Sequence, residues 1–415
     1  MNKVIAVLLA GLLLTGCART EPDAAGAGDA GPERVEAWMN VESYKSRQAM
    51  NRQRSSQWLR QPGNEGKSLE EAEAALGLAK PDAKGAIEAA LSIVEANPLD
   101  DLGFLALRFA FYELRSLESS ELEHYQDVVF RHLEAHYVND LRLDVMLLGL
   151  VRMGGEPGVK LVDQVVANSE HRQLRARGAF WSAMERLMEV DDLNTSPEER
   201  ARVRAEVTRM AQLVADEYSD VEVFRGEPGG VAIQPVLYAL DNVTVGAMLP
   251  EATAERVGGE QESLSQYRGN VLLLDFWATW CAPCIASLPD VERLQALLKD
   301  RDFQVITISI DENVELVEAF MADRMDLPYV NWFVGEQSDL YDDWAIQGVP
   351  TYIAVDRDGV VRGRSHSVES LYEVILEATG ADDEARVELV GEDGFTPGPE
   401  VIPVTKPEAD PPNVS

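Results

Sequence analysis

Two cysteines separated by two residues, Cys281 and Cys284, follow a short apolar run and open a helical pattern. The apolar run is Val271–Phe276, and the helical pattern covers Ala282–Leu298. A strand followed directly by a helix is the repeating unit of an α/β domain. The free backbone N–H groups of a helix N-terminus stabilise an anion, so a cysteine placed there loses its proton more easily. The pattern predicts an α/β domain with a reactive dithiol at the start of one helix.

The same alternation continues through the C-terminal third of the chain. Further β-rich runs occupy Gln304–Ile310, Tyr329–Val334, Thr351–Val355 and Val360–Arg364. Helical patterns lie between or after them, at Asn313–Asp323 and Ser367–Ala378. Asp356–Gly359 has the composition of a turn that closes a hairpin. Alternation of this kind indicates a central sheet covered by helices.

A Cys-X-X-Cys pair can also be half of a zinc site. Such a site needs a second cysteine pair or nearby histidines to complete its four ligands. Cys17 is the only other cysteine, and His366 is the only histidine that follows the pair. His132 and His136 stand four residues apart on a predicted helix, but no carboxylate constellation accompanies them. We therefore assign no metal site and no cofactor.

The first residues have the pattern of a lipoprotein signal peptide. Lys3 precedes the apolar run Val4–Leu14, which has about half of the ~20 residues that span a bilayer. The run ends in Leu14-Thr15-Gly16-Cys17, which resembles the lipobox of bacterial lipoproteins. The resemblance implies lipidation of Cys17 and a location on the periplasmic side of a bacterial membrane. Ala18, in place of Asp, favours the outer over the inner membrane. The alternative is an ordinary secretory signal with a chance cysteine.

Composition divides the chain into five regions. They are a signal peptide at 1–16, a flexible tether at 17–66 with one helix around 33–57, an all-α, helical-repeat-like domain at 67–220, the α/β domain at 236–380, and a disordered acidic, Pro-rich tail at 381–415. The chain has 72 acidic against 37 basic residues and a formal net charge of −35. Because phosphate contacts need clustered Lys and Arg, this balance argues against nucleic acid as a partner.

The residues around the dithiol resemble the active-site segment of thioredoxin-fold proteins. The segment Asp275–Cys284 reads Asp-Phe-Trp-Ala-Thr-Trp-Cys-Ala-Pro-Cys. Its surroundings are similar to those of the TlpA-like (ResA-like) branch of membrane-attached disulfide reductases. This second resemblance rests on Val245-Gly246 with Pro250, on Leu264–Gly269, and on Gly348–Thr351. It covers roughly 236–380 and implies a C-terminal thioredoxin fold behind the all-α domain.

The resemblance also implies roles for individual residues. Cys281 would be the nucleophile and Cys284 the resolving thiol, and the two would form the redox disulfide. Asp275, six residues before Cys281, would be a buried carboxylate that accepts a proton from Cys284. Pro350 would be a cis-proline facing the disulfide. The substrate face would comprise Trp280, Pro283, Val349 and Thr351.

The implied function is a thiol–disulfide oxidoreductase that reduces protein disulfides. Its partners would be protein disulfide substrates, a membrane electron donor of the thiol-reductase type, and the membrane itself through the lipid anchor. Relatives often carry Glu where this chain has Ser287 and a basic residue where it has Ile285, which leaves proton handling to Asp275 or water.

Two alternatives differ from this function in class. A thiol peroxidase would carry Pro and Thr where this chain has Leu274 and Ala278. A redox-sensing or scaffold lipoprotein would bind a partner through its helical domain, and the sequence leaves that interpretation open.

Overall fold

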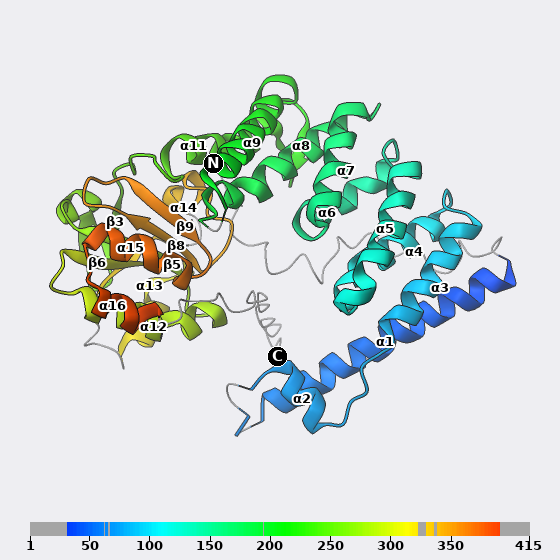
Figure 1. Cartoon of the computed structure of the whole chain (residues 1–415), viewed down its shortest axis with the longest axis horizontal. Coiled ribbons are helices and arrows are strands. Elements are labelled where there is room, and N and C mark those ends of the chain that lie inside the picture. The colour runs from blue at the N-terminus through cyan, green and yellow to red at the C-terminus, as the bar shows by residue number, and fades with distance from the viewer. Residues whose placement is uncertain are drawn as a thin grey trace, which may run out of the picture. The chain divides into compact units, whose positions relative to one another are not determined.

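A computed structural model describes residues 31–61, 63–64, 67–193, 195–322, 329–335 and 338–390 (Figure 1). The chain divides into two compact units, one reaching Trp181 and the other beginning at Ser182. The predicted signal peptide and Cys17 lie outside the described residues. Within the ranges given above, no helix combines the length and the apolar character needed to cross a membrane.

The first unit is built from helices. They are α1 (Pro32–Leu59), α2 (Leu69–Ala75), α3 (Ala83–Ala96), α4 (Asp101–Glu113), α5 (Ser119–His136), α6 (Leu147–Met153), α7 (Gly155–Asn168) and the first part of α8 (Arg172–Arg186). Side-chain caps set several of their starts, because Ser68, Asp82 and Asp100 each accept the backbone N–H three residues ahead. The apolar positions of these helices, recurring at three- and four-residue spacing, form the buried core.

Helix α1 confirms the helix expected around 33–57, within a region that we expected to be a flexible tether. It is 28 residues long and is held to the helices that follow it by polar contacts. The Arg34 guanidinium lies 2.6 Å from Asp100, the N-cap of α4, and the Tyr44 hydroxyl donates to Glu113 at 2.7 Å. The described part of this region is therefore a packed helix.

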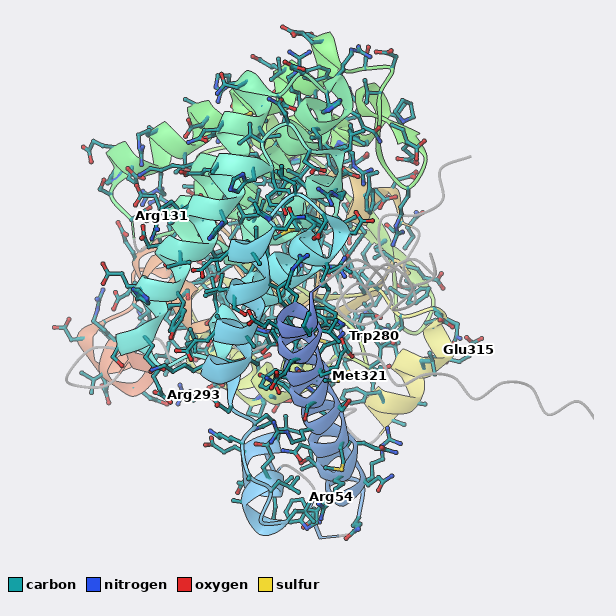
Figure 2. The ribbon with its side chains drawn as sticks, turned by 90° about the vertical axis from the view of Figure 1, so that its right-hand side faces the viewer. Arg54, Arg131, Trp280, Arg293, Glu315 and Met321 are labelled. Carbon is teal, nitrogen blue, oxygen red and sulfur yellow. A yellow bond between two sulfur atoms is a disulfide. The ribbon has the colours of Figure 1, made fainter. Side chains whose placement is uncertain are left out.

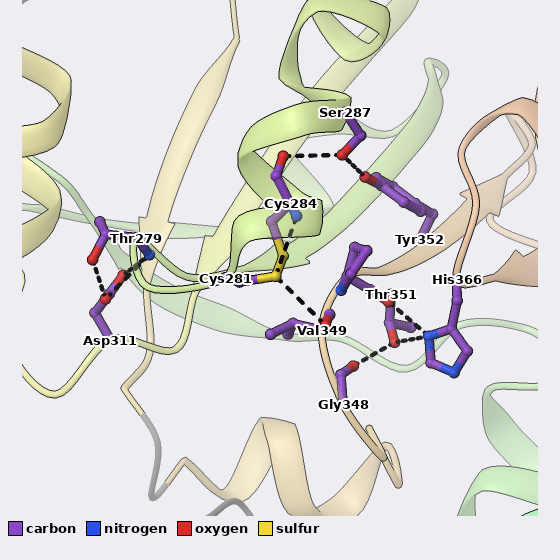
Figure 3. The surroundings of a disulfide bond; sticks show 11 residues. Thr279, Cys281, Cys284, Ser287, Asp311, Gly348, Val349, Thr351, Tyr352 and His366 are labelled. Carbon is purple, nitrogen blue, oxygen red and sulfur yellow. Dashed lines mark hydrogen bonds between the residues drawn. A yellow bond between two sulfur atoms is a disulfide. The ribbon is translucent and has the colours of Figure 1, made fainter. Parts of the chain in front are cut away.

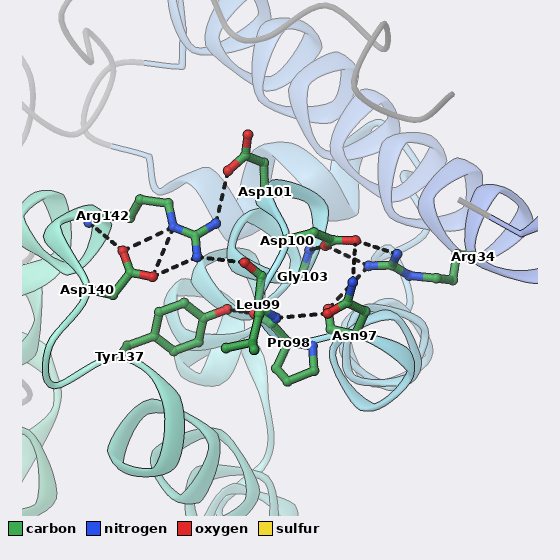
Figure 4. A network of polar contacts seen from close by, with 10 residues as sticks. All are labelled: Arg34, Asn97, Pro98, Leu99, Asp100, Asp101, Gly103, Tyr137, Asp140 and Arg142. Carbon is green, nitrogen blue, oxygen red and sulfur yellow. Dashed lines mark hydrogen bonds and ion pairs between the residues drawn. The ribbon is translucent and has the colours of Figure 1, made fainter. Parts of the chain in front are cut away.

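The loop between α3 and α4 is the centre of a polar network (Figure 4). Asp100 accepts the N–H of Gly103 in addition to its ion pair with Arg34. On the other side of the loop, Arg142 binds Asp140 and Asp101 and donates to a backbone carbonyl of the loop. These contacts fix the direction in which the chain enters α4.

The second unit begins with helices and a short hairpin. After the end of α8 come α9 (Pro197–Glu217), the hairpin strands β1 (Glu222–Phe224) and β2 (Glu227–Pro228), α10 (Gly229–Ala232) and α11 (Gln234–Asn242). Arg204 of α9 donates to the Thr244 hydroxyl at 2.6 Å, just after α11. We expected the helical domain to reach 220, but α9 packs against α10 and α11 and belongs to the unit that contains the sheet.

The sheet of this unit has seven strands. They are β3 (Thr253–Arg256), β4 (Glu260–Ser263), β5 (Val271–Trp277), β6 (Phe303–Ser309), β7 (Val330–Phe333), β8 (Thr351–Val355) and β9 (Val361–Ser365), in the order β4-β3-β7-β6-β5-β8-β9. Strands β5, β6 and β7 are parallel, whereas β8 pairs antiparallel with both β5 and β9. This mixed sheet with its covering helices is a thioredoxin fold, and every residue of its central strand β5 is buried.

Helices alternate with these strands and follow them. They are α12 (Ala282–Leu298), α13 (Val314–Met321), α14 (Asp339–Asp343), α15 (Tyr372–Thr379) and α16 (Asp383–Val390). Helix α12 packs on β6, and α15 packs on β5 and β9. Helix α13 is amphipathic, with Met321 buried and Glu315 exposed (Figure 2).

We expected a disordered tail from residue 381, and this boundary is too early. Residues 383–390 form α16, which packs against α15 and buries Ala385 and Leu389. An ion pair between Arg301 and Asp382 holds the connection between the two helices. The two apolar side chains, spaced one helical turn apart, give this acidic segment a face that can pack. Residues beyond 390 lie outside the described part of the chain.

Candidate active site

The two cysteines lie where β5 leads into α12 and form a disulfide (Figure 3). Cys281 is the N-cap of α12, and Pro283 stands in the first turn, where its missing N–H costs little. The backbone N–H of Cys284 donates to the Cys281 sulfur at 3.2 Å. In the reduced protein this N–H and the helix dipole would stabilise a Cys281 thiolate.

Both sulfurs are nearly enclosed in this oxidised state. Cys281 is 4% exposed and Cys284 is 2% exposed, so exposure alone does not distinguish the nucleophile that we expected. Their surroundings do differ. The Cys281 sulfur lies 3.5 Å from the carbonyl oxygen of Val349, at the edge of the neighbouring loop, whereas Cys284 lies within the first turn of the helix.

The loop that faces the disulfide contains a cis peptide bond between Val349 and Pro350. Both residues are half-buried and leave part of the loop open to a partner. Thr351, which we expected on the substrate face, is instead fully buried, and its hydroxyl donates to the Gly348 carbonyl at 2.7 Å. Thr351 therefore stabilises the loop through this hydrogen bond and is not part of its exposed surface.

His366 is a loop contact that the sequence reasoning did not find. Its Nδ1 lies 2.7 Å from the Pro350 carbonyl oxygen and 3.2 Å from the Thr351 hydroxyl. Since a carbonyl only accepts, Nδ1 carries the proton. The sequence signal for this contact was that His366 follows shortly after the predicted strand Val360–Arg364. In the structure this strand, β9, pairs with β8, which begins directly after Pro350.

Asp275 lies in β5, the strand that leads to the disulfide. The side chain is 2% exposed, and its Oδ1 has no hydrogen-bond partner among the described residues. Burial raises the pKa of this carboxyl from an ordinary 3.8 to about 8. With a pKa about one unit from neutral, the group is able both to accept and to return a proton.

The aromatic residues beside the site divide between core and surface. Trp277 is 1% exposed and packs against Phe320 with ring centroids 5.3 Å apart, so it is a core residue. Trp280 and Pro283 are half-buried and lie on either side of Cys281 in the sequence. Trp280 and Pro283 can therefore present part of their surface to a substrate, whereas Trp277 cannot.

A buried carboxylate holds the loop that precedes Cys281. Asp311 is completely buried and accepts hydrogen bonds from the Thr279 N–H at 3.0 Å and from its hydroxyl at 2.6 Å. The Ser309 hydroxyl is a further donor, at 2.8 Å. A carboxylate with this many donors anchors Thr279, two residues before the sulfur. The sequence signal was an Asp directly after a predicted strand, and it carried no indication of its partner.

Ser287 stands where the resemblance led us to expect Glu. Its hydroxyl donates to the Cys284 carbonyl at 2.9 Å and lies 2.6 Å from the Tyr352 hydroxyl (Figure 3). The side chain therefore links the first turn of α12 to strand β8.

Comparison with known proteins finds relatives of the C-terminal domain. The family model described as Redoxin matches residues 244–374. Over 120 residues the chain is 28% identical to the thiol-disulfide oxidoreductase ResA of Geobacillus kaustophilus, an alignment that covers 29% of this chain and 68% of that protein. A solved structure of a thiol-disulfide oxidoreductase from Bacteroides fragilis aligns with a TM-score of 0.29 and 28% identity, over 31% of this chain and 96% of that one.

A further relative is the thioredoxin-like protein YneN of Bacillus subtilis. The chain is 31% identical to it over 120 residues, which are 28% of this chain and 68% of that protein. The matched region contains the sheet, the disulfide and the cis-proline loop described above. Through this C-terminal domain, the chain belongs to the family of thioredoxin-like thiol–disulfide oxidoreductases.

Proposed function

We propose that this protein is a lipid-anchored thiol–disulfide reductase that opens disulfides of protein substrates on the periplasmic side of a bacterial membrane. The observation that supports it best is the position of the Cys281 sulfur. It receives a helix N-terminal N–H and lies 3.5 Å from the carbonyl of Val349, in the loop of the cis-proline. An extended substrate segment could pair with this loop and bring its disulfide to Cys281.

The reaction uses the chain's own dithiol and transfers two electrons. The Cys281 thiolate attacks one sulfur of the substrate disulfide, which forms a mixed disulfide and releases the other substrate sulfur as a thiolate. Cys284 then attacks Cys281, its proton passes to Asp275, and the second substrate thiolate leaves. The substrate is reduced and the Cys281–Cys284 pair is oxidised. A membrane thiol reductase would restore the dithiol by a second exchange of the same kind.

The reduction potential of the Cys281–Cys284 pair tests the direction of this reaction. Among the described residues, one backbone N–H is the only hydrogen-bond donor to the Cys281 sulfur. A reduced form with so little stabilisation makes a weak oxidant. We therefore expect a potential nearer to about −270 mV, as in thioredoxin, than to about −120 mV, as in the oxidant DsbA. Equilibration with glutathione buffers and alkylation of free thiols measures it. A value near −120 mV would identify the protein as an oxidant.

The anchor rests on the resemblance of Leu14–Cys17 to a lipobox and is tested separately. A Cys17→Ser variant should incorporate no labelled palmitate and should leave the membrane fraction, since several acyl chains together hold a protein stably. The matched control is Cys281→Ser, which removes a thiol from the dithiol and should stay attached. Density-gradient separation of the two membranes then tests the preference for the outer one. If Cys17→Ser stays in the membrane fraction, the lipoprotein assignment is wrong.

A further inference from the structure

A chain of two hydroxyl groups runs from α12 to β8 with a fixed direction. The Ser287 hydroxyl lies 2.9 Å from the Cys284 carbonyl oxygen and 2.6 Å from the Tyr352 hydroxyl (Figure 3). A carbonyl oxygen can only accept, so the single proton of Ser287 is directed to Cys284. Ser287 can then only accept from Tyr352. The proton of the Tyr352 hydroxyl is thereby committed to Ser287.

Tyr352 is the cross-strand neighbour of Asp275. The antiparallel register of β5 and β8 places these two residues directly opposite each other, so their side chains project from the same face of the sheet. On the other side of Asp275, the parallel strand β6 places Thr307 in register. The Thr307 hydroxyl donates to Asn331 at 2.6 Å. Both hydroxyl groups that flank Asp275 therefore direct their protons elsewhere, and its buried Oδ1 has no hydrogen-bond partner in the part of the chain that the structure describes.

We propose that Ser287 is a positioning residue that holds the Tyr352 proton away from Asp275, so that Tyr352 offers the buried Oδ1 of this carboxyl no hydrogen bond. This inference rests on the proposed function, in which Asp275 accepts the proton of Cys284. A buried carboxylate without a donor is disfavoured relative to the protonated carboxyl. Ser287 thus favours the protonated form of Asp275 although it does not contact this residue.

The ionisable groups near this chain do not provide the same effect. Burial raises the pKa of Asp275. Burial is also the main cause of the raised pKa of Tyr352, and Asp275, Glu369 and Tyr372 raise it further. Asp290 on α12 interacts with Glu369. These carboxylates oppose ionisation of their neighbours whether or not Ser287 is present. A change in Asp275 on removal of the Ser287 hydroxyl would therefore have to pass through Tyr352.

The test is a titration of Asp275 in the oxidised protein, where the two cysteines are joined and do not titrate. Infrared difference spectra against an Asp275→Asn variant isolate the signal of this carboxyl. In Ser287→Ala the Tyr352 proton is released and can donate to the carboxylate, so we expect the titration midpoint to fall by about one pH unit, the size of one hydrogen bond to a charged group. Ser287→Thr keeps the hydroxyl and should restore the midpoint.

The role of Tyr352 is tested by a double-mutant cycle. Tyr352→Phe removes both the proton and the lone pair, so the midpoint should stay raised by burial, and Ser287→Ala added to it should have no further effect. Tyr372→Phe removes another buried tyrosine hydroxyl of the same domain and should leave the midpoint unchanged. A fall on Ser287→Ala that is the same with and without Tyr352, or no fall at all, would overturn the proposal.

The outcome is separable from that of the proposed function. If the midpoints follow this pattern while the dithiol reduces no disulfide, the positioning role stands and the proposed function fails. If disulfide exchange proceeds while the Ser287→Ala midpoint equals that of the unmodified protein, the positioning role fails alone.

Discussion

A Cys284→Ser variant should accumulate covalent complexes with its substrates, and these should dissolve when a reductant is added. Cys281 receives the helix N-terminal N–H and faces the open loop at Val349, so it remains able to attack. Serine at 284 cannot resolve the mixed disulfide, and turnover should be lost completely. Gel electrophoresis with and without reductant would reveal the complexes, and mass spectrometry would identify the trapped substrates.

Cys281→Ser is the matched control, because it removes the other thiol of the same pair and should trap nothing. In the reduced protein, alkylation near neutral pH should label Cys281 faster than Cys284. If Cys281→Ser is the variant that traps partners, the two roles are inverted and the argument from the helix N-terminus fails. If the intact dithiol turns over no disulfide and neither variant traps a partner, a scaffold role of the helical unit becomes the better explanation.

The sequence predicted best the elements that are buried and close to the dithiol. The apolar run Val271–Phe276 predicted β5 to within one residue. The predicted bounds Thr351–Val355 and Ala282–Leu298 are the observed bounds of β8 and α12. In these segments the local pattern and the final environment agree, because a central strand is apolar along its whole length. The helix start was also locally specified, by a cap residue and by Pro283.

The elements that were missed have polar sequences. Strands β3 and β4 are largely exposed, and β4 is an edge strand of the sheet, so Glu260–Ser263 shows no apolar alternation. Helix α1 was predicted to within two residues at each end, but its packing was not, because Arg34, Tyr44 and Asn51 join it to the rest of its unit through polar groups. Patterns of hydrophobicity cannot detect such contacts.

The contacts that complete the site join residues far apart in the chain. Thr279 and Asp311 are separated by 32 positions, and Ser287 and Tyr352 by 65. Each residue is unremarkable in its own segment, and only the pairing of β5 with β6 and β8 brings the partners together. The motif residues were predictable because the resemblance implied their roles, whereas these supporting partners required the fold.

Asp275 should make the folded protein less stable as the pH rises. Its pKa is about 8 in the folded state against an ordinary 3.8. Between these values the unfolded chain has lost the proton and the folded chain keeps it, so the free energy of unfolding falls by about 1.4 kcal/mol per pH unit. The contribution is complete below about pH 4, decreases up to about pH 8 and is constant above it. From pH 4 to pH 7 the loss is on the order of 4 kcal/mol.

Asp275→Asn removes this titration and should therefore gain stability relative to the unmodified protein by the same amount over the same interval. Urea denaturation of the oxidised protein at several pH values measures the difference, with the disulfide intact in every sample. Asp300→Asn, at an exposed position just after α12, is the matched control and should reproduce the slope of the unmodified protein. Parallel profiles for Asp275→Asn and the unmodified protein would mean that the buried carboxyl titrates at its ordinary pKa. In that case Asp275 could not serve as the proton acceptor of Cys284 in the manner proposed, because near neutral pH its conjugate acid would be too strong to hold the proton.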